Sequence, residues 1–123
     1  MTLTTIADAK TFENAGFTFR PLAVPSRGST ELAVWAVDVA PGAESERHSV
    51  SREEVFVVRS GEIVAEIGGV EYRPAPGDAI ILPPGVPGKL ANRGGGTASM
   101  TVCTSKGMRG TIGDVTIDPP WAQ

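Results

Sequence analysis

The chain has 123 residues, with 11 Lys and Arg against 14 Asp and Glu and a formal net charge of −3. This length is typical of a single domain with its own core, so we take residues 1–123 as one domain. A slightly acidic chain without a run of Lys or Arg lacks the electrostatic footprint of a nucleic-acid-binding protein. No stretch approaches the roughly 18 apolar residues of a membrane span. We therefore expect neither nucleic acid nor a membrane as a partner.

Glycine and proline content indicates the fold class. The chain contains 15 Gly and 10 Pro, about twice the roughly 12% usual for soluble proteins. Both residues interrupt helices and mark turns, so the composition predicts an all-β protein. The opening MTLTTIADAK lacks a secretory pattern, and the single cysteine, Cys103, cannot form an internal disulfide. We therefore expect a cytoplasmic location.

The pattern along the chain predicts short strands. Residues 1–16 have no clear period and form an N-terminal arm, whereas apolar runs alternate with turn residues from Phe17 onward. Gly68-Gly69 predicts a two-residue hairpin turn, and the three glycines of Gly94–Gly96 predict a flexible connection. The clearest strands are Glu31–Val39, Glu54–Val58, Glu62–Ile67, Val70–Arg73, Ala79–Leu82 and Ala98–Thr104.

Two segments punctuated by glycine, residues 41–61 and 76–92, resemble the two sequence motifs of the cupin superfamily. The first motif is G, five residues, H, one residue, H, three or four residues, E, six residues, G. Its positions fall on Gly42, His48, Val50, Glu54 and Gly61. The second is G, five residues, P, one residue, G, two residues, H, three residues, N, and its positions fall on Gly77, Pro83, Gly85, Gly88 and Asn92. The resemblance implies a single cupin-type jelly-roll β-barrel.

Two of the four metal-ligand positions of the superfamily are replaced in this chain. In metal-binding cupins three histidines and a glutamate hold iron, manganese, zinc or nickel, but Val50 and Gly88 stand at two of these positions and leave His48 and Glu54. Catalytic zinc and non-haem iron need three protein ligands. A third would have to come from a partner subunit or from another side chain of this one, namely Cys103, Glu46 or Asp38. We expect no cofactor; if one binds, it is a divalent transition metal at His48 and Glu54.

The surviving histidine and glutamate form the candidate catalytic pair. If His48 and Val50 share a strand they face the same side, and if Glu54 opens the next strand on that side, an imidazole and a carboxyl group meet in a largely apolar cavity. Burial would raise the pKa of the carboxyl group and an ion pair would lower it. Such a pair could move a proton near neutral pH. The alternative is that His48 and Glu54 are the two remaining ligands of an ancestral metal site, and that they now interact only with each other and have no function.

Other residues are candidates for the cavity wall, because apolar and aromatic side chains usually line small-molecule pockets. Gly88 should also enlarge the cavity, because the ligand side chain is missing there. Trp121 either closes one end of the barrel or packs against a second subunit. Cys103 has no second histidine to activate it, so we expect a small wall residue and no nucleophile. The predicted lining set is Trp35, Val50, Phe56, Tyr72, Gly88, Met100 and Cys103.

Three functions fit these residues. The first is a metal-independent isomerase, epimerase or cyclase that acts on a carbonyl-rich metabolite through His48 and Glu54. The resemblance permits this function, because the cupin superfamily includes such enzymes. The second is a non-catalytic sensor or carrier of a small ligand. The third is a metal-dependent cupin, such as a dioxygenase, with an altered ligand set. Because single-domain cupins often pair through their sheets, we also expect a homodimer.

Overall fold

The computed structural model describes all 123 residues and is almost entirely β. None of its helices has the length and apolar character needed to cross a membrane. Two short 3-10 helices, η1 (Pro25–Arg27) and η2 (Pro120–Ala122), accompany the strands. The strands are β1 (Phe12–Asn14), β2 (Phe17–Ala23), β3 (Leu32–Val39), β4 (Ser49–Val50), β5 (Glu54–Ser60), β6 (Ile63–Ile67), β7 (Val70–Tyr72), β8 (Ala79–Leu82), β9 (Gly88–Asn92), β10 (Ala98–Ser105), β11 (Gly110–Ile112) and β12 (Val115–Ile117).

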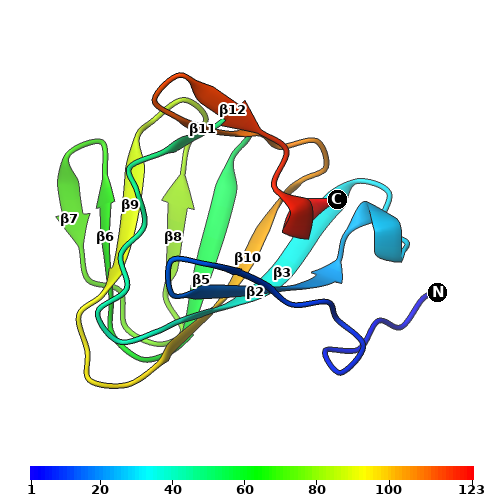
Figure 1. The fold of residues 1–123 in the computed structure, drawn as a ribbon, viewed down its shortest axis with the longest axis horizontal. Coiled ribbons are helices and arrows are strands. Elements are labelled where there is room, and N and C mark those ends of the chain that lie inside the picture. The colour runs from blue at the N-terminus through cyan, green and yellow to red at the C-terminus, as the bar shows by residue number, and fades with distance from the viewer.

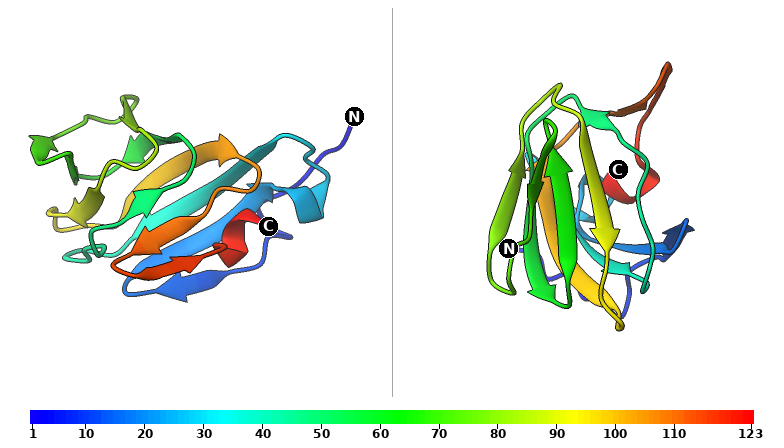
Figure 2. Two further views of the ribbon diagram at one scale, coloured as in Figure 1. Left: turned by 90° about the horizontal axis from the view of Figure 1, so that it is seen from above. Right: turned by 90° about the vertical axis from the view of Figure 1, so that its left-hand side faces the viewer.

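The strands form three sheets (Figure 1). The largest has six strands in the order β1-β2-β3-β10-β5-β8, and every paired neighbour is antiparallel. A second sheet, β7-β6-β9, faces part of it, as the right-hand view of Figure 2 shows. The third, β12-β11-β4, covers one end of the space between them. This arrangement confirms the predicted all-β jelly roll.

The sheets do not close into a continuous barrel, which corrects the expectation of a closed one. Between β3 and β4 the chain runs beside β9 without forming a regular strand: five backbone hydrogen bonds join them, with isolated bridges from Glu44 to Ala91 and from His48 to Gly88. Strands β1 and β8 remain the edges of the large sheet. The large sheet and the β7-β6-β9 sheet are therefore joined on this side by an irregular segment and not by a continuous ladder.

The core lies on the inner face of the large sheet, where side chains alternate between buried and half-exposed. Strand β3 buries Ala33, Trp35, Val37 and Val39. The central strand β10 pairs with both β3 and β5, and its Met100 lies opposite Val37 on one side. Each fully buried side chain of this kind contributes roughly 1.5–3 kcal/mol. The period of two seen in the sequence therefore decides which residues face the interior.

The predicted strands are confirmed to within two residues at each end. Gly68 and Gly69 have φ values of 58° and 82° and join β6 to β7 in the predicted hairpin. The Gly94–Gly96 connection after β9 has less conformational freedom than its three glycines predict. The buried Asn92 side chain holds it by donating hydrogen bonds to the carbonyl oxygens of Val39 and Gly96, at 2.9 and 2.8 Å. The N-terminal arm forms no helix, and its last residues belong to β1.

Candidate functional site

A cavity of about 340 Å³ opens between the inner face of the large sheet and the β11–β12 hairpin. Fifteen of its 23 lining residues are hydrophobic. Pockets of this size and character are typical of sites for compact small molecules. The lining brings together residues from both ends of the chain, with Phe17 and Phe19 on β2 and Trp121 on η2.

Glu54 is the deepest ionisable group of the cavity. It is the first residue of β5 and lies between Thr104 of β10 and Leu82 of β8. Its side chain is only 4% exposed, and its carboxyl group accepts no hydrogen bond and forms no ion pair with the protein. Burial without a partner disfavours the charged form and raises the pKa of Glu54 to about 7. The group can therefore both hold and release a proton near neutral pH.

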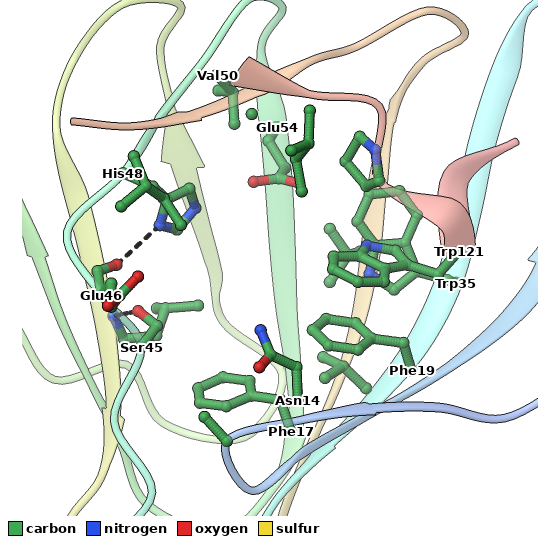
Figure 3. A pocket seen from close by; sticks show the side chains of 18 of the residues that line it. Asn14, Phe17, Phe19, Trp35, Ser45, Glu46, His48, Val50, Glu54 and Trp121 are labelled. Atoms are coloured by element: carbon green, nitrogen blue, oxygen red, sulfur yellow. Dashed lines mark hydrogen bonds between the residues drawn. The ribbon is translucent and has the colours of Figure 1, made fainter. Parts of the chain in front are cut away.

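His48 lies on the other side of the cavity from the aromatic side chains (Figure 3). Its backbone exchanges two hydrogen bonds with Gly88, at 2.9 and 2.7 Å, which fixes the segment directly before β4. Its Nδ1 lies 3.1 Å from the backbone oxygen of Glu46. Because that oxygen can only accept, Nδ1 carries the hydrogen and Nε2 is left for the cavity. His48 and Glu54 both line the cavity, but no hydrogen bond joins them.

The two replaced ligand positions behave differently. Val50 is buried in β4 and lines the cavity, so an apolar wall stands where the motif has a histidine. Gly88 leaves no space, because a Cβ there would lie 2.9 Å from Leu82 Cδ1. The expected gain in cavity volume at Gly88 is therefore wrong: Leu82 occupies the space, and Gly88 borders only a small neighbouring hollow.

The donor set does not fit a metal ion. No cluster of three His, Cys, Asp or Glu side chains occurs in the structure. Asp38 is paired with Arg20 at 2.7 Å, and Cys103 points to the opposite face of β10 from the cavity. Glu46 lines the cavity but does not complete a group of three with His48 and Glu54. Two donors are fewer than catalytic zinc or non-haem iron requires.

Four of the seven residues predicted for the wall line this cavity, namely Trp35, Val50, Phe56 and Met100. The expectation is wrong for Tyr72 and Cys103. Tyr72 lies on the outer strand β7 and is 49% exposed. Cys103 alternates with Met100 and Val102 along β10, so it faces outward when they face inward.

The sequence-based site lacks Phe17, Phe19 and the β11–β12 hairpin, all of which line the cavity. Phe19 stacks on Trp121 with ring centroids 3.7 Å apart and planes 5° from parallel. The sequence allows two places for Trp121, an end of the barrel or a subunit contact, and the structure places its side chain in the wall of this chain's own cavity. The exposed apolar residues Ile112, Val115 and Ile117 of β11 and β12 line the cavity as well. Their alternation in the segment TIGDVTI is the signal that could have revealed them.

Comparison with known proteins decides the family. The sequence profile of the Cupin domain family matches residues 35–104, which is more than half of the chain. This chain belongs to the cupin family. None of the curated proteins compared is similar enough to count as a match.

Solved structures share the fold of this cupin at low sequence identity. The polyketide cyclase RemF from Streptomyces resistomycificus aligns with a TM-score of 0.74 at 22% identity, over 85% of this chain and 79% of the cyclase. A sugar phosphate isomerase from Silicibacter pomeroyi aligns with a TM-score of 0.74 at 20% identity, over 94% of this chain and 87% of that one. Salicylate 1,2-dioxygenase from Pseudoaminobacter salicylatoxidans aligns with a TM-score of 0.72 at 18% identity, over 85% of this chain and 31% of the dioxygenase. At these identities the likeness concerns the fold, and function has to come from the site.

Proposed function

We propose that this cupin binds a small carbonyl compound in its cavity and moves a proton on it without a metal, as an isomerase, epimerase or cyclase. The observation that carries the proposal is the buried Glu54 carboxyl group, which has no partner in the protein and a pKa raised to about 7. A general base or acid works best when its pKa is near the working pH. Perturbed carboxyl groups in a cavity are candidates for such a role.

The chemistry follows from the two side chains. The Glu54 carboxylate takes a proton from the carbon beside the carbonyl, the C–H electron pair forms the carbon–carbon double bond, and the π pair of the carbonyl moves to its oxygen. His48, in its protonated form, donates the Nε2 proton to that oxygen, which gives a neutral enol. Return of a proton to another carbon or to the opposite face completes an isomerisation or epimerisation. In a cyclase the enol carbon instead attacks a second carbonyl of the same molecule; the enol O–H returns its proton to His48 as the first carbonyl re-forms, and the oxygen of the second carbonyl takes the proton held by Glu54.

Deuterium exchange tests this function even when the natural substrate is unidentified. A library of carbonyl metabolites is incubated with the protein in D2O, and exchange at the carbon beside the carbonyl is followed by NMR. We expect at least one compound to exchange faster with the wild type than with Glu54→Gln or His48→Ala. Both variants should remain folded by circular dichroism. Equal exchange by wild type and Glu54→Gln for every compound would contradict the proposal.

A non-catalytic sensor or carrier is the second candidate. The observation that favours it is the lack of a hydrogen bond between His48 and Glu54, which line the same apolar cavity without forming a prearranged pair. A ligand present at a hundred times its Kd adds roughly 2.7 kcal/mol of stability. A metabolite that raises the Tm but is returned unchanged, with no exchange, would favour this candidate over the enzyme.

We also propose that the cupin forms a homodimer. A row of apolar side chains crosses the outer face of the large sheet, where Cys103 lies opposite Val34 and Val55, and Val55 lies opposite Ile81. Ile81 at the edge strand β8 is 56% exposed. An exposed apolar row at a sheet edge is a common feature of surfaces that pair with another chain.

A further inference from the structure

The charge of the cavity wall restricts its ligand. No Lys or Arg is among the 23 lining residues, whereas Glu44, Glu46 and Glu54 are. Glu44 is already paired with Lys89, whose amine lies outside the cavity wall. His48 is the only basic side chain that faces the space. A phosphate or carboxylate group entering this cavity would lose its hydration and meet carboxyl groups with no Lys or Arg to pair with, which is costly; one imidazole, that of His48, is the single group that can offset its charge.

The opposite wall is built from aromatic rings. Phe17 and Phe19 have ring centroids 6.2 Å apart with planes inclined by 19°, and Phe19 stacks on Trp121. In Figure 3 Phe19, Trp35 and Trp121 lie across the cavity from His48, and Phe17 lies at its lower end. Flat rings bound against such a wall gain both buried area and offset stacking.

Trp121 is held in this wall by the end of the chain. The hydroxyl of Ser26 donates a hydrogen bond of 2.7 Å to the backbone oxygen of Gln123. The Gln123 side-chain amide donates to the backbone oxygen of Pro119 at 2.9 Å. Ala122 is buried in the core. These contacts fix the 3-10 turn on both sides of Trp121, so the indole is a preorganised part of the wall.

We propose that the cavity binds an uncharged ring compound that bears a carbonyl or hydroxyl group, an inference that rests on the proposed function. Phosphorylated and carboxylated compounds are excluded. Trp121 is a specificity-determining residue, because the ring of the ligand packs against it. The polar group of the ligand then lies toward Glu54 and His48, and its ring lies toward Phe19 and Trp121. The cavity of about 340 Å³ limits the ligand to a compact molecule.

The test compares two probes that share a ring system and differ in charge. The purified protein is titrated with 2-naphthol and with 2-naphthyl phosphate by isothermal titration calorimetry at pH 7. We expect 2-naphthol to bind and the phosphate ester to bind at least about tenfold more weakly. Failure of 2-naphthol to bind at millimolar concentration, or equal or tighter binding of the phosphate ester, would overturn the proposal.

Variants of the aromatic wall distinguish a loss of ring stacking from a nonspecific loss of ligand binding. Trp121→Leu should weaken 2-naphthol binding roughly two- to tenfold, because it removes the ring, whereas Trp121→Phe should restore most of the affinity. Tyr72→Leu removes an exposed aromatic ring outside the cavity and is the matched control, with no change expected. Unchanged affinity in a folded Trp121→Leu protein would overturn the role of Trp121.

The two proposals fail separately. Binding of 2-naphthol needs no turnover. If no Glu54-dependent deuterium exchange is observed, the proposed reaction is therefore contradicted, but the proposed ligand class is not. If the protein prefers the phosphate ester, the proposed ligand class is contradicted, but proton transfer on a different substrate is not.

Discussion

Glu54 is an acid placed where the strand pattern calls for an apolar side chain. It occupies the same inward-facing row of β5 as Phe56 and Val58, which are both buried. Nothing in the protein pairs with its charge, so the native structure favours the protonated form. A residue of this kind costs stability whenever it ionises, which is a reason to connect it with function.

The first prediction concerns stability and pH. The folded protein keeps the Glu54 proton up to pH about 7, whereas an unperturbed glutamate loses it near 4.5. Between these values the unfolded chain binds fewer protons, so the free energy of unfolding falls as the pH rises. Glu54→Gln removes this titration. The difference in unfolding free energy, wild type minus variant, should therefore decrease by about 3 kcal/mol between pH 4.5 and pH 7.

Urea unfolding of both proteins at several pH values measures this difference. Other titrating groups cancel in the comparison, since the two proteins share them. A difference that stays flat from pH 4.5 to pH 7 would mean that Glu54 titrates like an exposed carboxyl group.

The second prediction concerns the missing ligands. Val50 lines the cavity with His48 and Glu54, so Val50→His adds the third donor that catalytic zinc requires. We expect the variant to bind about one equivalent of Zn²⁺ and the wild type, purified without chelator, to carry less than about a tenth of an equivalent of any transition metal. Val50→Leu is the control for size. A wild type that carries a stoichiometric transition metal would show that the donor set is larger than the structure indicates.

At the residue scale, motif spacing points to His48, Val50 and Glu54, and all three line the cavity, whereas Gly88 does not. The spacing does not reveal that Leu82 fills the space beside Gly88, because β8 and β9 belong to different sheets and their approach depends on how those sheets pack. The outward direction of Cys103 is readable from its alternation with Met100, since neighbouring strand residues face opposite sides.

At the element scale, the hairpin between β6 and β7 shows how local sequence sets structure. Gly69 has a φ of 82°, and a Cβ there would meet nothing within 4 Å. Glycine is therefore required at this position by the positive φ and not by a lack of space for a side chain. The predicted strands follow from apolar alternation. Of the strands that are not predicted, β1, β4, β11 and β12 have only two or three residues and depend on their partners. The longer β2 and β9 contain Pro21 and Gly88, residues that are typical of turns.

The third prediction uses this turn. Gly69→Ala should lower the free energy of unfolding by roughly 1–2 kcal/mol, because a residue with a Cβ is strained in the left-handed region. Gly95→Ala is the matched control, since Gly95 also has open space around it but lacks a positive φ. Chemical unfolding of the two variants should give a clear loss for the first only; equal effects would argue against a backbone origin.

At the scale of the whole molecule, the exposed apolar row on the large sheet bears on assembly. The fourth prediction is that light scattering at micromolar concentration gives twice the chain mass of 12.8 kDa. Ile81→Lys should shift the protein toward the monomer, because it places a charge in that row. Leu3→Lys, at an arm residue that is 87% exposed, should leave the mass unchanged. A wild-type mass near 12.8 kDa would contradict the dimer.

The most direct test of the proposed proton transfer is the titration of Glu54 itself. Selective ¹³C labelling of glutamate side chains, with Glu54→Gln to assign the resonance, allows the carboxyl group to be followed by NMR from pH 3 to pH 9. The structure predicts a midpoint at about pH 7. A midpoint near 4.5, the ordinary glutamate value, would mean that the carboxyl group is hydrated or paired in solution, and the proposed proton transfer would lose its basis.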